Sequence, residues 1–201
     1  MAIKVANNQS LTAISALPAA VSSGAMTLLE TQTASSSATI SFTSGIDSTY
    51  KEYIFRFYDI HPATDQKQLT FQVDTGTNTS YNQTITSTTF QTYHNEGDTS
   101  TALTYLTGYD QAQGTAVQMI SEATGNANDE CVSGYLHLFD PSNATFVKHF
   151  MARTQAAEGS GHSGETYAAG YVNTTTALTR IQFAFVSGNI DAGTIKLYGV
   201  T

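Results

Sequence analysis

The stretch TRIQFAFVSGNIDAGTIKLYGV, residues 179–200, contains two alternating runs around a turn. Ile181, Phe183 and Phe185 share one face of the first run, and Ile195 and Leu197 share one face of the second. Alternation with period two, interrupted by Ser-Gly-Asn and Asp-Ala-Gly, is typical of a strand, a turn and a strand. We therefore predict that the chain ends in a hairpin of two paired strands with one buried face.

Alternating and β-branched runs also fill most of the chain from residue 38 onward, with short turn sequences between them. The predicted strands lie at residues 39–42, 52–60, 69–73, 84–92, 101–106, 118–121, 132–139, 146–153, 168–173, 179–186 and 193–200. Residues 156–164 are rich in Gly and Ser and are predicted to form a loop. So many short strands favour an all-β fold, an antiparallel β-sandwich with a jelly-roll-like topology.

The first 37 residues differ from the remainder, because they contain no aromatic residue and only two charged side chains, Lys4 and Glu30. Such a segment cannot bury enough apolar surface to fold alone, although residues 26–29 are interpreted as a short strand. We predict an extended N-terminal arm at residues 1–37, which docks onto a neighbouring surface, and a β-sandwich domain at residues 38–201. The docking side chains are expected to be the aliphatic ones: Leu11, Ile14, Leu17, Leu28 and Leu29.

Composition argues against several classes of function. The net charge is −8 and the eight Lys and Arg residues are scattered singly, so we expect no nucleic-acid binding. No run approaches the roughly 18 apolar residues of a membrane-spanning helix, so we expect no membrane insertion. Residues 11–20 are too polar for a signal peptide, and we expect no cleaved leader. Cys131 is the single cysteine, so stability must come from packing or assembly.

Two short motifs resemble catalytic sequences. Asp74-Thr75-Gly76 matches the aspartic protease motif, which needs two such carboxylates sharing one proton. Asp-x-Gly is also a common turn after a strand, and no flap sequence follows it here. Residues 161–165 nearly match the nucleophile elbow Gly-x-Ser-x-Gly, but Glu165 replaces the second glycine. We therefore predict no catalytic residue and no enzymatic activity.

Five histidines raise the question of a metal site: His61, His94, His137, His149 and His162. His137 and His149 fall on neighbouring predicted strands, but no pair has the close spacing of a zinc motif. Residues 94–98 and 126–130 are rich in oxygen ligands without the spacing of a calcium loop. We predict no metal and no cofactor.

Several tyrosines flank polar loops: Tyr81, Tyr93, Tyr105, Tyr109 and Tyr167. A loop surface of Tyr, Asn and Asp suits the stacking of a sugar ring as well as contact with a protein. Tyrosines also cap the strands of a sandwich, and this structural interpretation is the favoured one. The five tyrosines are the candidate ligand-binding residues.

Four segments resemble the small β-rich virion proteins of tailed bacteriophages, notably marine ones. They are ATISFTSGIDSTY (38–50), IHPATD (60–65), LFDPSNATFVKHF (138–150) and SGNIDAGTIKLYG (187–199). NQSL (8–11) and ALPAAV (16–21) are similar to the start of phage fibre-type chains. The resemblance marks a group and not an activity, so it assigns no catalytic residue.

What the resemblance implies is a structural part of the particle exterior, a capsid decoration protein or a fibre component. We expect a non-enzymatic protein that docks on other virion proteins through its arm and forms a homotrimer. Its expected location is the virion, which assembles in the host cytoplasm. The alternative is a host-surface glycan-binding module of a tail fibre.

Overall fold

The structure is a computed structural model that describes residues 25–201 of the chain. All regular secondary structure in this range is β, in thirteen strands. In chain order the strands are β1 (Met26–Thr33), β2 (Ile40–Phe42), β3 (Glu52–Pro62), β4 (Leu69–Thr75), β5 (Ile85–Asn95), β6 (Thr101–Tyr105), β7 (Ala112–Gly114), β8 (Gln118–Met119), β9 (Val132–Phe139), β10 (Lys148–Glu158), β11 (His162–Val172), β12 (Leu178–Phe185) and β13 (Ile190–Val200). In residues 25–201, no helix has the length and hydropathy needed to span a bilayer.

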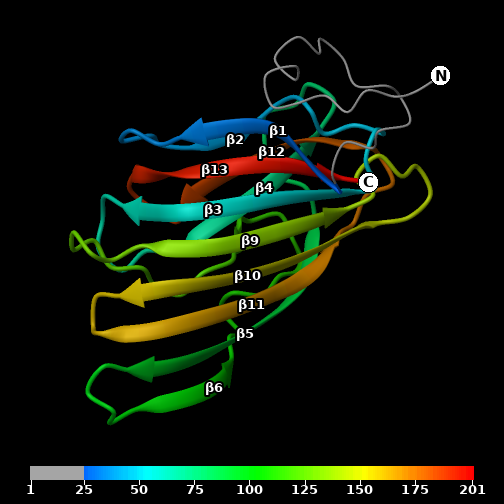
Figure 1. The fold of residues 1–201 in the computed structure, drawn as a ribbon. Coiled ribbons are helices and arrows are strands. Elements are labelled where there is room, and N and C mark those ends of the chain that lie inside the picture. The colour runs from blue at the N-terminus through cyan, green and yellow to red at the C-terminus, as the bar shows by residue number, and fades with distance from the viewer. Residues whose placement is uncertain (1–24) are drawn as a thin grey trace, which may run out of the picture.

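The strands form two antiparallel sheets that pack face to face. The larger sheet has nine strands in the order β1-β13-β3-β9-β10-β11-β5-β6, with β7 paired beside β5. The smaller sheet has the order β2-β12-β4-β8. Figure 1 shows the larger sheet with its strands one below another from β13 to β6. The predicted all-β antiparallel sandwich is confirmed, whereas the jelly-roll connectivity is not, because nine strands face four.

The core lies between the sheets and is built largely from phenylalanine rings. Phe183 of β12 lies 5.3 Å from Phe55 and 5.2 Å from Phe57 between ring centroids, so it joins the two sheets. Phe71 of β4 and Phe150 of β10 make a second contact across the sandwich at 5.0 Å, edge to face. Such aromatic pairs contribute about 0.5–1.5 kcal/mol beyond their burial. Alternation along the strands places these rings inward, where they are fully buried.

The C-terminal stretch forms two strands as predicted, but the strands do not pair with each other. β12 pairs with β2 and β4 in the smaller sheet, while β13 pairs with β1 and β3 in the larger sheet. The link between them, which includes Gly188 at a φ of 79°, passes from one sheet to the other. The predicted hairpin is wrong because alternation shows only that one face of each strand is buried. A hairpin and a crossing between sheets satisfy that pattern equally well.

The chain is already part of the larger sheet at Met26, inside the region predicted to be an arm. β1 is an edge strand whose pairing with β13 runs from Met26 opposite Val200 to Thr33 opposite Thr194. Leu29 packs against the core, whereas the neighbouring Leu28 is 50% exposed. The other three predicted docking residues precede residue 25 and lie outside the described range, so their role stays a prediction.

The predicted loop at residues 156–164 is mostly strand. β10 continues to Glu158 and β11 begins at His162, so only residues 159–161 remain as a turn. The Gly and Ser residues hid the strand from sequence inspection, because they carry little of the alternation that marks a strand. A Cβ at position 164 would lie 3.1 Å from Cγ of Glu122, so a larger residue there would make the Glu122 side chain shift.

Candidate ligand-binding face of the larger sheet

The larger sheet has one face against the core and an outer face that the smaller sheet does not cover. Along β10, Phe150, Ala152 and Thr154 are buried, whereas the alternate residues Met151 and Arg153 point outward. Ten large apolar side chains are exposed within residues 25–201, and the strand registers put seven of them on this face. The seven are Met26, Leu28, Tyr58, Phe90, Leu103, Tyr105 and Met151. They are spread from β1 at one edge of the sheet to β6 at the other, so this outer face carries most of the exposed apolar side chains.

A row of cationic and aromatic side chains crosses this outer face from strand to strand. Each member is the direct cross-strand partner of the next, so the register of seven strands creates the row. In the order β13, β3, β9, β10, β11, β5 and β6, the residues are Lys196, Arg56, Tyr135, Arg153, Tyr167, Phe90 and Tyr105. We call this set the cation–aromatic row. Directly opposed side chains in a sheet are close enough to contact each other.

The side chains of the row contact one another through their rings. The guanidinium of Arg56 lies 5.5 Å from the ring centroid of Tyr135, and that of Arg153 lies 5.2 Å from the ring of Tyr167. Tyr167 and Phe90 are stacked with centroids 4.8 Å apart and planes 7° apart. Cation–π contacts of this kind contribute about 0.5–1 kcal/mol at exposed sites. The five members of the row from Arg56 to Phe90 are thus neighbouring flat side chains, and these three contacts join them in pairs.

Hydrogen bonds fix the middle of the row. Arg153 Nε donates to Glu165 Oε1 at 2.5 Å, and the Tyr167 hydroxyl donates to Glu165 Oε2 at 2.9 Å. The hydrogen bond from Arg153 holds the pKa of Glu165 below its ordinary value, and the same bond raises the pKa of Arg153. The hydrogen bond to Glu165 raises the pKa of Tyr167. Glu165 is therefore ionised at neutral pH and holds the arginine and the tyrosine in one geometry.

The outer face is hollowed along β10 and β11. Two hollows of about 510 and 340 Å³ share Thr88, Met151 and Ala169, so they form one continuous groove. Small side chains make its floor. The rings along it come from the row and from its neighbours: Phe90, Tyr135, Phe139, His149, Tyr167 and Tyr171. A concave surface with aromatic walls and a few polar groups is the usual form of a ligand site.

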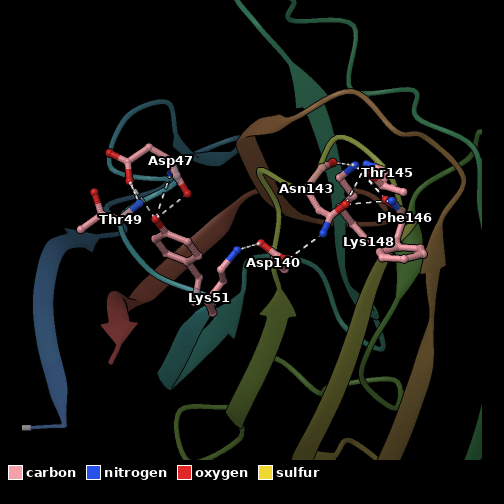
Figure 2. Close-up of polar contacts among 9 residues, drawn as sticks. Asp47, Thr49, Lys51, Asp140, Asn143, Thr145, Phe146 and Lys148 are labelled. Carbon is pink, nitrogen blue, oxygen red and sulfur yellow. Dashed lines mark hydrogen bonds and ion pairs between the residues drawn. The ribbon is translucent and has the colours of Figure 1, made fainter.

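A loop at residues 140–147 lies beside one end of the groove, and the buried Lys148 holds it in place (Figure 2). Lys148 Nζ donates to the backbone oxygens of Asn143 at 2.5 Å, Phe146 at 3.1 Å and Thr174 at 3.0 Å. Burial lowers the pKa of Lys148, and the charge of Asp140 opposes that effect. The anchored loop presents the Phe146 ring, 68% exposed, beside a third hollow of about 540 Å³ that adjoins the groove at Phe139 and His149.

The structure brings only two of the five predicted tyrosines, Tyr105 and Tyr167, into the row. Tyr93 stacks on His162 at 4.9 Å, where the inner side of β5 meets β11. Tyr109 accepts a hydrogen bond from Gln68 Nε2 at 2.8 Å, and burial raises its pKa. Tyr81 lies in the loop after β4 with a φ of 46°. The five tyrosines therefore do not form one binding surface.

Asp74, which belongs to the protease-like motif, holds a loop. Its carboxylate accepts hydrogen bonds from the backbone nitrogens of Thr75 at 2.8 Å and Tyr81 at 2.9 Å. The side-chain amide of Gln83 adds a third at 3.1 Å, and Asp74 is 1% exposed. This arrangement clamps the turn after β4.

Four of the five histidines each pair with a single carboxylate. His162 Nδ1 lies 2.6 Å from Glu158 Oε2, His94 lies 3.0 Å from Asp98, and His137 contacts Glu52. Within residues 25–201, no three His, Cys, Asp or Glu side chains lie together in a way that could hold a metal ion. His137 and His149 do fall on neighbouring strands, but their rings contact aromatic neighbours instead, Tyr135 and Tyr171.

The sequence did not reveal Arg56, Tyr135, Arg153 or Phe90 as site residues. Each occupies an outward position of an alternating strand, which the sequence does show. Their alignment into a row depends on the pairing register, and a shift of one residue would turn a strand's whole set to the other face. The sequence therefore showed which residue types lie on each outer face, but it did not show which of these residues are neighbours across the strands.

Comparison of this chain with known proteins finds no matching family model, no similar curated protein and no similar solved structure.

Proposed function

We propose that this chain is a non-enzymatic structural protein of the exterior of a tailed-phage virion, a capsid decoration or fibre component. The observation that carries the proposal is the gathering of exposed apolar side chains on the outer face of the larger sheet. Seven of the ten exposed large apolar side chains of the described residues share this face, which makes it the described surface best suited to contact another body. The resemblance of four sequence segments to phage virion proteins supports the same proposal.

The position of the chain ends suits a docked component. Met26 pairs with Val200, so the start of the described chain and its C-terminus lie at one end of the sandwich (Figure 1). Residues 1–24 join the sandwich there and supply three of the aliphatic residues expected to dock: Leu11, Ile14 and Leu17. Docking at this end leaves the opposite end of the sandwich free to face outward. Each aliphatic side chain contributes about 1.5–3 kcal/mol when it is fully buried.

A truncation that respects the strand boundaries tests this proposal. Deletion of residues 2–24 leaves β1 whole, so the purified body should keep the circular dichroism and the melting temperature of the full chain. Particles assembled in cells that supply only the truncated protein should lack it, as shown by mass spectrometry of gradient-purified particles. Replacement of Leu11, Ile14 and Leu17 by Ser in the full-length chain should give the same loss. Normal incorporation of either variant overturns the docking proposal.

The groove favours a second function, recognition of a host-surface glycan by a fibre module. The specific observation is the set of aromatic rings on the outer face, because the apolar faces of sugar rings stack on aromatic side chains. This function is compatible with a structural role on the particle exterior. Its binding surface would be the sheet face, which includes Tyr105 and Tyr167 from the set that the sequence suggested but not the other three tyrosines.

A further inference from the structure

Two cations of the row have no acidic partner in the described part of the chain. Arg56 and Lys196 are neighbours in the register of β3 and β13, and neither joins any ion pair within residues 25–201. Each lies over a tyrosine ring instead, Arg56 over Tyr135 at 5.5 Å and Lys196 over Tyr58 at 5.4 Å. The rings orient both cations without neutralising them.

The charge of the whole chain makes this placement distinctive. The net charge is −8, and seven of the eight Lys and Arg residues lie in the described range. Three of those seven, Arg56, Arg153 and Lys196, occupy the row. Three of the seven cations thus lie on the face that carries the exposed aromatic rings, and one of the three, Arg153, is paired with Glu165. Charge complementarity points to a ligand that carries negative charge as well as flat apolar faces.

We propose that the cation–aromatic row and the adjoining groove bind a carboxylate-bearing polysaccharide. This inference rests on the glycan-recognition function above and names its ligand class. The sugar rings would pack on the exposed edges of Tyr135, Tyr167 and Phe90, because Arg56, Arg153 and the Tyr167–Phe90 stack cover ring faces. The sugar carboxylates would pair with Arg56 and Lys196. Arginine suits this role because its planar fork can bind both oxygens of a carboxylate.

The dimensions of the row favour a chain over a single sugar. Seven strands spaced about 4.8 Å apart give the row a length of about 29 Å, which needs an extended ligand. Nucleic acid is a poor fit, because three cations on a chain of net charge −8 cannot offset a phosphate about every 3.4 Å along a strand. A polysaccharide with spaced carboxylates matches both the length and the modest positive charge.

The test measures binding of the full-length chain to a panel of acidic oligosaccharides by isothermal titration calorimetry. The panel holds alginate, polygalacturonate, hyaluronan and sialylated oligosaccharides, each beside its carboxyl-reduced counterpart. We expect at least one acidic form to bind more tightly than its reduced form, with affinity falling between 50 and 200 mM salt. Arg56→Gln and Lys196→Gln should each weaken binding about tenfold, the effect of one charged hydrogen bond.

Arg180→Gln is the matched control, since it makes the same charge change on the smaller sheet, on the opposite side of the sandwich. It should leave binding unchanged. Tyr167→Ala should weaken binding of the acidic and reduced forms alike, because it removes a ring that lines the groove. Melting temperatures of all four variants show whether each one is folded.

The possible results separate the inference from the function on which it rests. No binding of any oligosaccharide overturns both. Equal binding of acidic and reduced forms, with Arg56→Gln silent, leaves glycan recognition standing and overturns the acidic ligand class. Light scattering tests whether a second copy of the chain, and not a glycan, covers the outer face. If the wild type is an oligomer that Arg56→Gln or Lys196→Gln converts to monomers, the face is a subunit interface and the inference is overturned.

Discussion

The two faces of the larger sheet are made by the same strands and have opposite chemistry. On β3, Phe55 and Phe57 point into the core and are fully buried, while Arg56 between them points outward over Tyr135. The inner face fits the smaller sheet closely, whereas the outer face keeps aromatic rings and cations exposed. Period-two alternation thus lets one strand serve stability on one side and contact on the other. The faces should therefore respond differently to the same substitution.

The largest expected effect is on the inner face. Phe183→Ala removes a ring that contacts both Phe55 and Phe57, and it should lower the free energy of unfolding by about 3–5 kcal/mol. Phe90→Ala makes the same change on the outer face, where the ring is 41% exposed, and should cost less than about 1 kcal/mol. Urea denaturation followed by circular dichroism measures both. Equal losses would show that the outer face is as important to folding as the core.

An intermediate effect is expected at the loop of residues 140–147, which lies beside the groove. Lys148→Met removes the donor for three backbone oxygens and should lower the free energy of unfolding by about 3 kcal/mol. Lys51→Met is the matched control, because Lys51 is 81% exposed and pairs with Asp140 of the same loop (Figure 2). The control should cost less than about 1 kcal/mol. A similar loss in both variants would mean that the ion pair at the surface, and not the buried lysine, holds the loop.

The smallest effect is the acid response of the outer face. The pKa of Glu165 is lowered in the folded chain, so its contribution to stability is present above the ordinary value of 4.5 and is lost as the pH falls through the folded pKa. The pair with Arg153 lies at the surface, so this contribution should be below about 1 kcal/mol. A stability profile from pH 7 to 3 should be flatter in Glu165→Gln than in the wild type. Identical profiles would show that the Arg153 bond does not affect the ionisation of Glu165.

Strand positions and the direction of each buried face were readable from the sequence, because alternation is a local property. The run around Phe55 and the run at residues 132–139 illustrate this, since both match the observed strands β3 and β9. Turn chemistry was less reliable. The Gly and Ser residues around Gly161 suggested a long loop where the structure has a tight turn between β10 and β11.

The pairing of the strands could not be predicted from the sequence, because it joins residues that are far apart in the chain. The sequence therefore missed the separation of β12 and β13 into different sheets, and it missed the row in which Arg56 meets Tyr135 and Arg153 meets Tyr167. The buried Lys148 was missed for a similar reason. A lysine is usually exposed, and its three backbone acceptors are brought to it only by the folded loop and by Thr174.

The crossing from β12 to β13 also has a consequence for synthesis. β12 lies between β2 and β4, and β13 lies between β1 and β3, so each sheet gets an interior strand from the last 24 residues. A nascent chain that stops before residue 178 has a gap in both sheets and exposes unpaired strand edges. Neither sheet is complete until residues 178–200 have been synthesised, so shorter copies are prone to aggregate.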